Sequence, residues 1–106
     1  MTAVNINANG KTYSFQVYSK YVDFSGYANR SGVYLFLRDK GSDYEVIYVG
    51  QSSDITTRLS NHERLPEANR LGMSHIAVAL VPLRELDGVE KDLIGRFCPM
   101  MNTQWT

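Results

Sequence analysis

The chain has 106 residues, 43% of them hydrophobic and 21% charged, and its 11 basic and 11 acidic side chains give a formal net charge of zero. This length predicts one globular domain with a small core, and no apolar run approaches the ~18 residues that would span a bilayer. The neutral balance argues against a domain that holds duplex nucleic acid by charge alone, because neutralising phosphates supplies most non-specific affinity.

The N-terminal segment has neither the basic start nor the apolar stretch of a secretion signal. The single cysteine, Cys98, excludes an internal disulfide. It follows Phe97 on an apolar helical pattern, which predicts a small buried hydrophobe rather than a reactive thiol. We therefore expect an intracellular, cytoplasmic protein of bacterial or phage-like type.

Residues 3–18 predict a β-hairpin, because Asn9-Gly10 is a favoured two-residue turn. Centring the turn there makes one face apolar on both strands. Its opposed pairs are Ile6 with Tyr13 and Val4 with Phe15. Such a face is too large to leave in water, so the hairpin is expected to pack on the core or to form a dimer contact.

Residues 19–31 carry three aromatic residues at spacings of three: Tyr21, Phe24 and Tyr27. The favoured interpretation is an irregular segment whose aromatic rings cover the core, because burial of an aromatic ring is worth more than its exposure. The alternative is a set of platforms on which bases stack.

A second hairpin is predicted from the β-branched and aromatic runs 32–37 and 45–50, which flank a short polar loop. If the pairing is symmetric about Gly41, Tyr34 lies opposite Tyr48 and both side chains project from one face. A shift of one residue would separate them.

The remaining chain predicts helices around one more strand. Asp54 is placed to cap a helix on which Arg58 and His62 share a face with Ile55 and Leu59. A short helical piece is expected over 63–71, with Pro66 in its first turn and Gly72 at its end. Residues 74–81 predict a central strand, residues 85–97 predict a helix that Pro99 stops, and Trp105 in the tail is placed to pack back on the domain. This order of elements predicts an α+β fold with a mostly antiparallel sheet.

Three polar residues lie on apolar helical faces, where burial costs free energy unless they are paired: Arg58, His62 and Glu90. If both helices pack on one sheet, these side chains converge near the tyrosine pair. The alternatives are a structural ion pair between Arg58 and Glu90, a core histidine, and two ordinary sheet tyrosines.

This combination suits phosphodiester hydrolysis. A lone carboxylate can hold one Mg²⁺ whose other positions are filled by water and phosphate oxygen, and an arginine can bind two phosphate oxygens at once. A tyrosine or histidine can receive the proton of an attacking water. An unperturbed tyrosine is ionised only ~0.1% at pH 7, so a tyrosine base would need its pKa lowered by the metal, the arginine or the histidine.

Over residues 31–103 the chain resembles the GIY-YIG nuclease superfamily. Gly32-Val33-Tyr34 and Tyr48-Val49-Gly50 match its two signatures, with Val in place of Ile. Arg58 and His62 are similar to the family's helix with an arginine and a later His or Tyr, and Glu90 and Asn102 to its closing segment. The resemblance implies an α+β fold in which helices flank a small central antiparallel sheet. It also implies a single domain over 1–106, with core 31–103 and an added N-terminal hairpin within 1–30.

The resemblance further implies a divalent-metal-dependent endonuclease with a single Mg²⁺ or Mn²⁺ held by Glu90. Arg58 would grip the scissile phosphate, and Tyr34 would be the general base or would position the water, alone or through His62. Tyr48 would hydrogen-bond in the same cluster, and Asn102 would buttress the site. Without the family, Asn102 would be interpreted as a polar residue of a solvated tail.

Nucleic acid, and DNA in particular, is the expected partner. Family members often append a DNA-binding domain, and we expect none for this neutral chain, so affinity would come from local arginines, a homodimer, a partner protein or an unusual nucleic-acid shape. Two alternatives stay open. One is a catalytically weak or inactive module that binds nucleic acid or acts as an inhibitor, and the other is a nuclease for small oligonucleotide signals.

Overall fold

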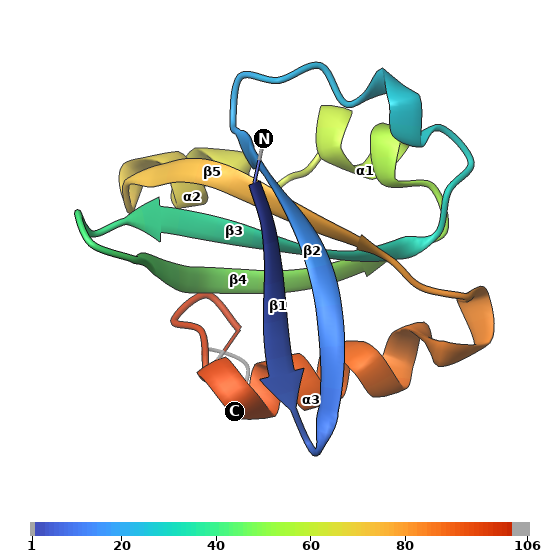
Figure 1. The fold of residues 1–106 in the computed structure, drawn as a ribbon. Coiled ribbons are helices and arrows are strands. Elements are labelled where there is room, and N and C mark those ends of the chain that lie inside the picture. Colours follow the sequence, from blue (N-terminus) through green and yellow to red (C-terminus); the bar gives the residue numbers. More distant parts are fainter. Residues whose placement is uncertain (1, 103–106) are drawn as a thin grey trace.

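The computed structural model describes residues 2–102, and in them five strands form one sheet in the order β1-β2-β5-β3-β4 (Figure 1). Every neighbouring pair is antiparallel, which confirms the predicted α+β class. The strands are β1 (Thr2–Ala8), β2 (Lys11–Ser19), β3 (Gly32–Asp39), β4 (Tyr44–Ser52) and β5 (Met73–Leu80). Strand β4 is therefore an outer strand of the sheet, next to β3.

The N-terminal hairpin has the predicted register, with Ile6 opposite Tyr13 and Val4 opposite Phe15. Its turn residues Asn9 and Gly10 both have positive φ, as a two-residue hairpin turn requires. The hairpin is continuous with the sheet, because β2 also pairs with β5, and its apolar face packs on the core. The core contact that we expected is therefore confirmed.

The helices cover both faces of the sheet (Figure 1). Helices α1 (Ile55–Ser60) and α2 (Leu65–Arg70) lie on one face, together with a short 3-10 turn, η1 (Ser25–Tyr27). Helix α3 (Leu86–Phe97) follows a second 3-10 turn, η2 (Leu83–Glu85), and covers the other face. Successive strand residues point to opposite faces, so Tyr34 and Phe36 face α1 whereas Leu35 and Leu37 face α3.

The predicted register of β3 and β4 is wrong by two residues. Tyr34 lies opposite Gly50, and Phe36 lies opposite Tyr48. The turn is centred after Gly41 rather than on it, and a bulge at Ile47 adds a further shift. Beyond the bulge the shift totals two residues, which keeps side chains on their expected face, so Tyr34 and Tyr48 remain neighbours with ring centroids 6.3 Å apart.

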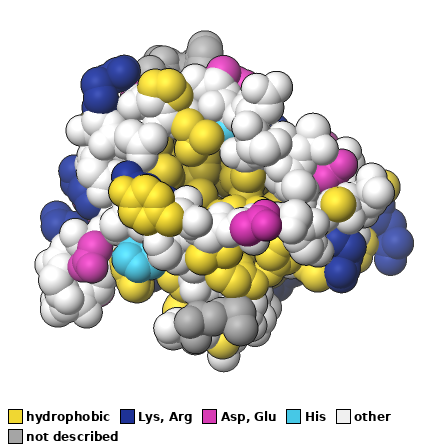
Figure 2. Space-filling view, turned by 90° about the horizontal axis from the view of Figure 1, so that it is seen from above, with side chains coloured by type: hydrophobic (Ala, Val, Ile, Leu, Met, Phe, Trp, Pro, Cys, Tyr) yellow, Lys and Arg dark blue, Asp and Glu magenta, His cyan; other side chains and the backbone are white. Residues whose placement is uncertain are grey.

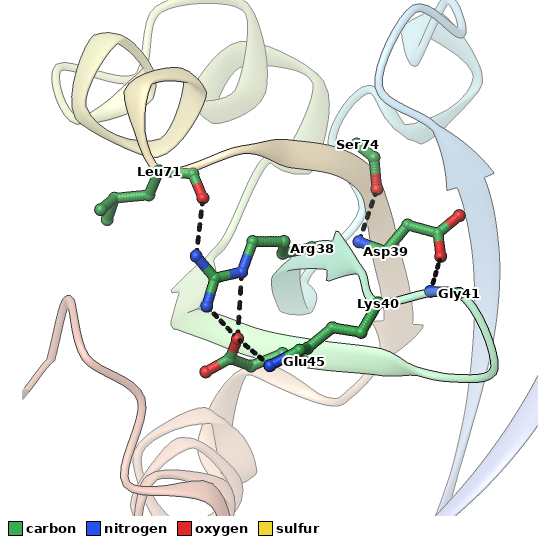
Figure 3. Close-up of polar contacts among 7 residues, drawn as sticks. All are labelled: Arg38, Asp39, Lys40, Gly41, Glu45, Leu71 and Ser74. Atoms are coloured by element: carbon green, nitrogen blue, oxygen red, sulfur yellow. Dashed lines mark hydrogen bonds and ion pairs between the residues drawn. The ribbon is translucent and has the colours of Figure 1, made fainter.

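The loop end of this hairpin is tied to α2 by Arg38 (Figure 3). Its Nε donates to Glu45 at 3.0 Å, its Nη2 forms an ion pair with the same carboxylate, and its Nη1 donates to the carbonyl of Leu71 at 3.1 Å. Lys40 adds a second cation 3.8 Å from Glu45. The Glu45 carboxylate is therefore compensated by two cations.

The aromatic residues between β2 and β3 differ in burial. Phe24 and Tyr27 pack against the core, as favoured, whereas the Tyr21 side chain is 85% exposed. Beside this segment lies a hollow of about 580 Å³ with a hydrophobic floor that includes Leu59 and Ile76 (Figure 2). The prediction of a buried cysteine is wrong: Cys98 is exposed, because it ends α3 in a left-handed conformation.

In the part of the chain that the structure describes, no helix is long and apolar enough to cross a membrane. The predicted packing of Trp105 falls outside the described residues.

Candidate active site at the edge of strand β4

At the glycines of the two signature tripeptides, Gly32 and Gly50, neighbouring atoms lie too close to leave room for a side chain. A Cβ on Gly32 would lie 2.3 Å from the carbonyl oxygen of Ala79 on the neighbouring strand. A Cβ on Gly50 would lie 2.4 Å from Cζ and 2.5 Å from Oη of Tyr34. The Tyr34 ring therefore lies against the backbone of the outer strand at Gly50, with its hydroxyl beside that strand.

His62 lies beyond the helix on which the sequence pattern placed it, because α1 ends at Ser60 and Asn61 caps it. The side chain is only 4% exposed and sits in the turn before α2. Its Nε2 lies 2.9 Å from the Tyr34 hydroxyl, and its Nδ1 accepts a hydrogen bond from the backbone N–H of Arg64 at 3.1 Å. An accepting Nδ1 leaves the proton on Nε2, so His62 donates to Tyr34. Burial, assisted by the charge of Arg58, lowers the pKa of His62 to about 4, so the ring is neutral at pH 7.

Tyr48 completes an aromatic cluster beside this pair. Its ring lies 5.4 Å from the His62 ring, centroid to centroid, and the Arg64 guanidinium lies 5.4 Å from its centroid. Burial raises the pKa of Tyr48, and the charges of Arg58 and Arg64 oppose that rise. Burial likewise raises the pKa of Tyr34, while the charge of Arg58 and its hydrogen bond to the hydroxyl act in the lowering direction. The expected lowering of a tyrosine pKa is thus not achieved by these side chains alone.

Arg58 comes from α1, whose first turn is capped by the Asp54 side chain through the Thr57 N–H at 3.2 Å, as predicted. The guanidinium donates two parallel hydrogen bonds of 2.8 Å to the carboxylate of Glu63. This pairing raises the pKa of Arg58 and lowers that of Glu63 to about 2. The two terminal nitrogens of Arg58 therefore bind a carboxylate in a bidentate geometry that also suits a phosphate.

Glu90 approaches the same edge from the opposite face, on α3. It is half-buried, and its Oε1 accepts a hydrogen bond from Nε2 of Gln51 at 3.0 Å. Its negative charge contributes to the raised pKa values of Tyr34 and Tyr48, and its partner Gln51 directly follows Gly50 on β4. Among residues 2–102 no cation lies within ion-pair distance of Glu90, so the structural Arg58–Glu90 pair considered above is wrong.

Asn102 binds the backbone of β4 from the tail. Its Oδ1 accepts from the Val49 N–H at 2.8 Å, and its Nδ2 donates to the Val49 carbonyl at 3.0 Å. One residue earlier, the Met101 N–H donates to the carbonyl of the bulged Ile47 at 3.0 Å. These hydrogen bonds pair backbone groups of β4 beside the site, so Asn102 is not a freely solvated residue.

The donor set fits a divalent cation. Glu90 is a half-buried carboxylate without a cationic partner, and the described residues contain no group of three or more metal-ligating side chains. A cation there would have one carboxylate ligand, with water and phosphate oxygens in its other positions, which is a coordination that Mg²⁺ readily adopts.

Three helical or turn segments thus bring Arg58, His62 and Glu90 to a tyrosine pair on the central hairpin. Together with the sheet order, this arrangement defines the class of protein: the chain has the fold of the GIY-YIG endonuclease domain.

The structural neighbours are forms of one domain, the GIY-YIG N-terminal endonuclease domain of UvrC from Thermotoga maritima. The form bound to magnesium, its catalytic divalent cation, is 23% identical with a TM-score of 0.57, and the match covers 72% of this chain and 86% of that one. A tyrosine-to-phenylalanine point mutant gives the same values, and an asparagine-to-alanine mutant matches at 23% identity and TM-score 0.55, covering 69% and 82%. No protein-family model matches the chain, and no curated protein matches it.

Sequence reasoning missed two residues that contact the site, Gln51 and Glu63. Glu63 follows Arg58 by five residues, whereas neighbours on a helix surface are three or four residues apart. The helical pattern therefore does not predict their pairing. Gln51 directly follows the second signature tripeptide, and its alternation with Gly50 places it on the α3 face of the sheet. That alternation was a usable signal for its contact with α3.

Proposed function

We propose that this protein is a divalent-metal-dependent endonuclease that hydrolyses phosphodiester bonds of nucleic acid, DNA being the expected substrate. The observation that carries the proposal is the meeting of Tyr34, Arg58 and an uncompensated Glu90 at one strand edge, from three separate elements. The fold shared with a magnesium-bound endonuclease domain supports it. An intracellular location and the domain limits 1–106 belong to the same proposal.

In this proposal Glu90 holds a single Mg²⁺ or Mn²⁺, which would stabilise charge on the phosphate and lower the pKa of bound water. Arg58 binds two non-bridging phosphate oxygens after exchanging Glu63 for the substrate. Tyr48 packs beside the reacting group, and Asn102 holds β4 in place at Val49.

Tyr34 is the proposed proton acceptor, as the phenolate formed when its own hydroxyl proton is lost to solvent, and His62 is its positioning partner. The Nε2–H of His62 donates to the Tyr34 oxygen, so the histidine is not placed to take a proton from it. On deprotonation, the same N–H and the Arg58 guanidinium would stabilise the phenolate. This assignment favours Tyr34 over His62 as the general base.

Three features of the chain support a second candidate, a module that binds nucleic acid or inhibits another protein without catalysis. Arg58 is already paired with a carboxylate, and burial raises the pKa of Tyr34. A chain of zero net charge also needs a partner, a homodimer or an unusual nucleic-acid shape for tight binding.

The test is incubation of the purified protein with supercoiled plasmid and with duplex, branched and single-stranded oligonucleotides, in Mg²⁺, Mn²⁺ or EDTA. Short cyclic and linear oligonucleotides extend the panel to small signals. We expect metal-dependent cleavage that EDTA abolishes. Binding without cleavage on every substrate, at high enzyme and low salt, would instead establish the binding module.

A further inference from the structure

Gln51 joins two carboxylates of α3 to the edge of the sheet. Its Nε2 donates to Oε1 of Glu90 at 3.0 Å and to Oδ1 of Asp87 at 2.6 Å. The two acidic residues are three positions apart on the helix, so their side chains lie on one face. A side-chain amide has two N–H bonds, and here one is available for each carboxylate.

This contact orients Glu90 without neutralising it. An amide carries no net charge, so the carboxylate keeps its formal negative charge. Within residues 2–102 no hydrogen bond to Oε2 of Glu90 occurs, which leaves that oxygen open. The exposed Asp87 in turn fixes the amide from its other side. Ligating carboxylates are commonly held in this way by hydrogen bonds from neighbouring groups.

From this geometry we infer that Gln51 is a positioning residue, anchored by Asp87, that holds Glu90 in the orientation in which it binds the divalent cation. The inference rests on the proposed function, since it concerns the same cation. Gln51 does not itself contact the cation or the substrate. Its effect therefore belongs in the dissociation constant of the metal, measured without nucleic acid.

The principal variant is Gln51→Leu, which keeps the side-chain size and removes the donor. We expect the Kd for Mn²⁺, measured on the full chain by titration calorimetry or electron paramagnetic resonance, to rise about tenfold. Gln16→Leu is the matched control: it makes the same change at half-buried Gln16 on β2, which β5 and β3 separate from β4. Thermal unfolding of both variants checks that the protein remains folded.

The anchor is tested with Asp87→Asn, compared with Asp92→Asn. Both variants remove one negative charge from α3, but Asp92 contacts Asn9 and Tyr13 instead of Gln51. We expect Asp87→Asn to weaken Mn²⁺ binding more than Asp92→Asn does. In the Gln51→Leu background this excess should disappear, because Asp87 acts through Gln51.

The outcomes separate this inference from the proposed function. If the wild-type chain binds no Mn²⁺, the metal-dependent function and the inference are both wrong. If the wild type binds Mn²⁺ and Gln51→Leu binds it equally well or more tightly, only the inference is wrong. Tighter binding would mean that the amide competes with the cation for Glu90.

Discussion

The two ends of the central β3–β4 hairpin each hold an arginine in contact with a glutamate, but among the described residues only the site end also has a half-buried glutamate without a cation. The side chains of Arg38 and Arg58 are almost equally exposed, at 32% and 31%, so burial does not distinguish them. At the loop end, Arg38 and Lys40 compensate Glu45 (Figure 3). At the other end, Arg58 is paired with Glu63 while Glu90 has no cation.

This difference in charge pairing indicates which end of the hairpin binds a ligand. A half-buried charge is tolerated when a partner satisfies it, and a network with every member paired holds elements together. An uncompensated carboxylate beside an arginine and a tyrosine hydroxyl instead leaves a place for a cation and its anionic substrate. We therefore expect substitutions at the loop end to change stability and those at the site end to change activity.

The largest effect is expected for Glu90→Gln. The change keeps size and polarity and preserves the contact with Gln51, so melting temperature should stay close to the wild-type value. Cleavage should fall by several orders of magnitude, because metal stabilisation of phosphoryl charge is among the largest catalytic terms. Nucleic-acid binding should persist or tighten, since an anion facing the phosphate is removed. A mutant that cleaves at the wild-type rate would remove Glu90 from the site.

Glu45→Gln is the matched control at the loop end. It weakens the partner of Arg38, and for this partly exposed pair we expect a loss of about 1 kcal/mol of stability in urea unfolding. Cleavage per folded molecule should be unchanged. Loss of activity in a folded Glu45→Gln protein would contradict the distinction between the two ends.

The next largest effect is expected for Gly50→Ala. The added Cβ would meet the buried Tyr34 ring at 2.4 Å, so the ring must move from its hydrogen bond with His62. We expect destabilisation of about 1–3 kcal/mol from overpacking and a fall in cleavage of about a hundredfold from the misplaced hydroxyl. Gly95→Ala is the control, because a Cβ there meets no atom within 4 Å. Equal behaviour of the two variants in unfolding and cleavage assays would refute the close-approach argument.

A smaller effect is expected for Glu63→Gln, and here the affinity for nucleic acid should increase. The Glu63 carboxylate holds both arms of the Arg58 fork, in the place proposed for phosphate oxygens. Replacing it with a neutral amide should free Arg58 and tighten nucleic-acid binding by up to about tenfold, measured by fluorescence anisotropy at fixed salt. Glu67→Gln, on α2, controls for the charge. Weaker binding in Glu63→Gln alone would show that Glu63 orients Arg58 rather than competing with the substrate.

At neutral pH the smallest effect is expected at His62, whose contribution is a pH dependence of stability that appears only in acid. Its pKa falls from an ordinary value of about 6.5 to about 4 in the folded protein, so the unfolded chain binds the proton first as pH drops. The resulting contribution is present above pH 6.5 and is lost between about pH 6.5 and 4. It amounts to about 3 kcal/mol. His62→Phe should therefore show a flatter loss of stability across this window in urea unfolding, and an unchanged slope would contradict the lowered pKa.

The sequence by itself determined the features that depend on neighbouring residues. The Asn9-Gly10 turn fixed the register of the first hairpin, because a two-residue turn leaves no freedom in pairing. Asp54 could be identified as a cap from its position before Ile55. The alternation along β3 and β4 determined which side chains share a face, so Tyr34 and Tyr48 were predicted as neighbours despite the wrong register. The candidate site residues followed from polar positions on apolar patterns and from the family resemblance.

Only the tertiary structure decided how these residues are paired. The longer β3–β4 turn and the bulge at Ile47 shifted the register, since neither is specified by a short local motif. Helices α1 and α3 reach the site from opposite faces, and this placed Glu90 beside Gln51 rather than Arg58. Periodicity reports which face of an element is apolar, but the partner of a charged group depends on which elements meet in space.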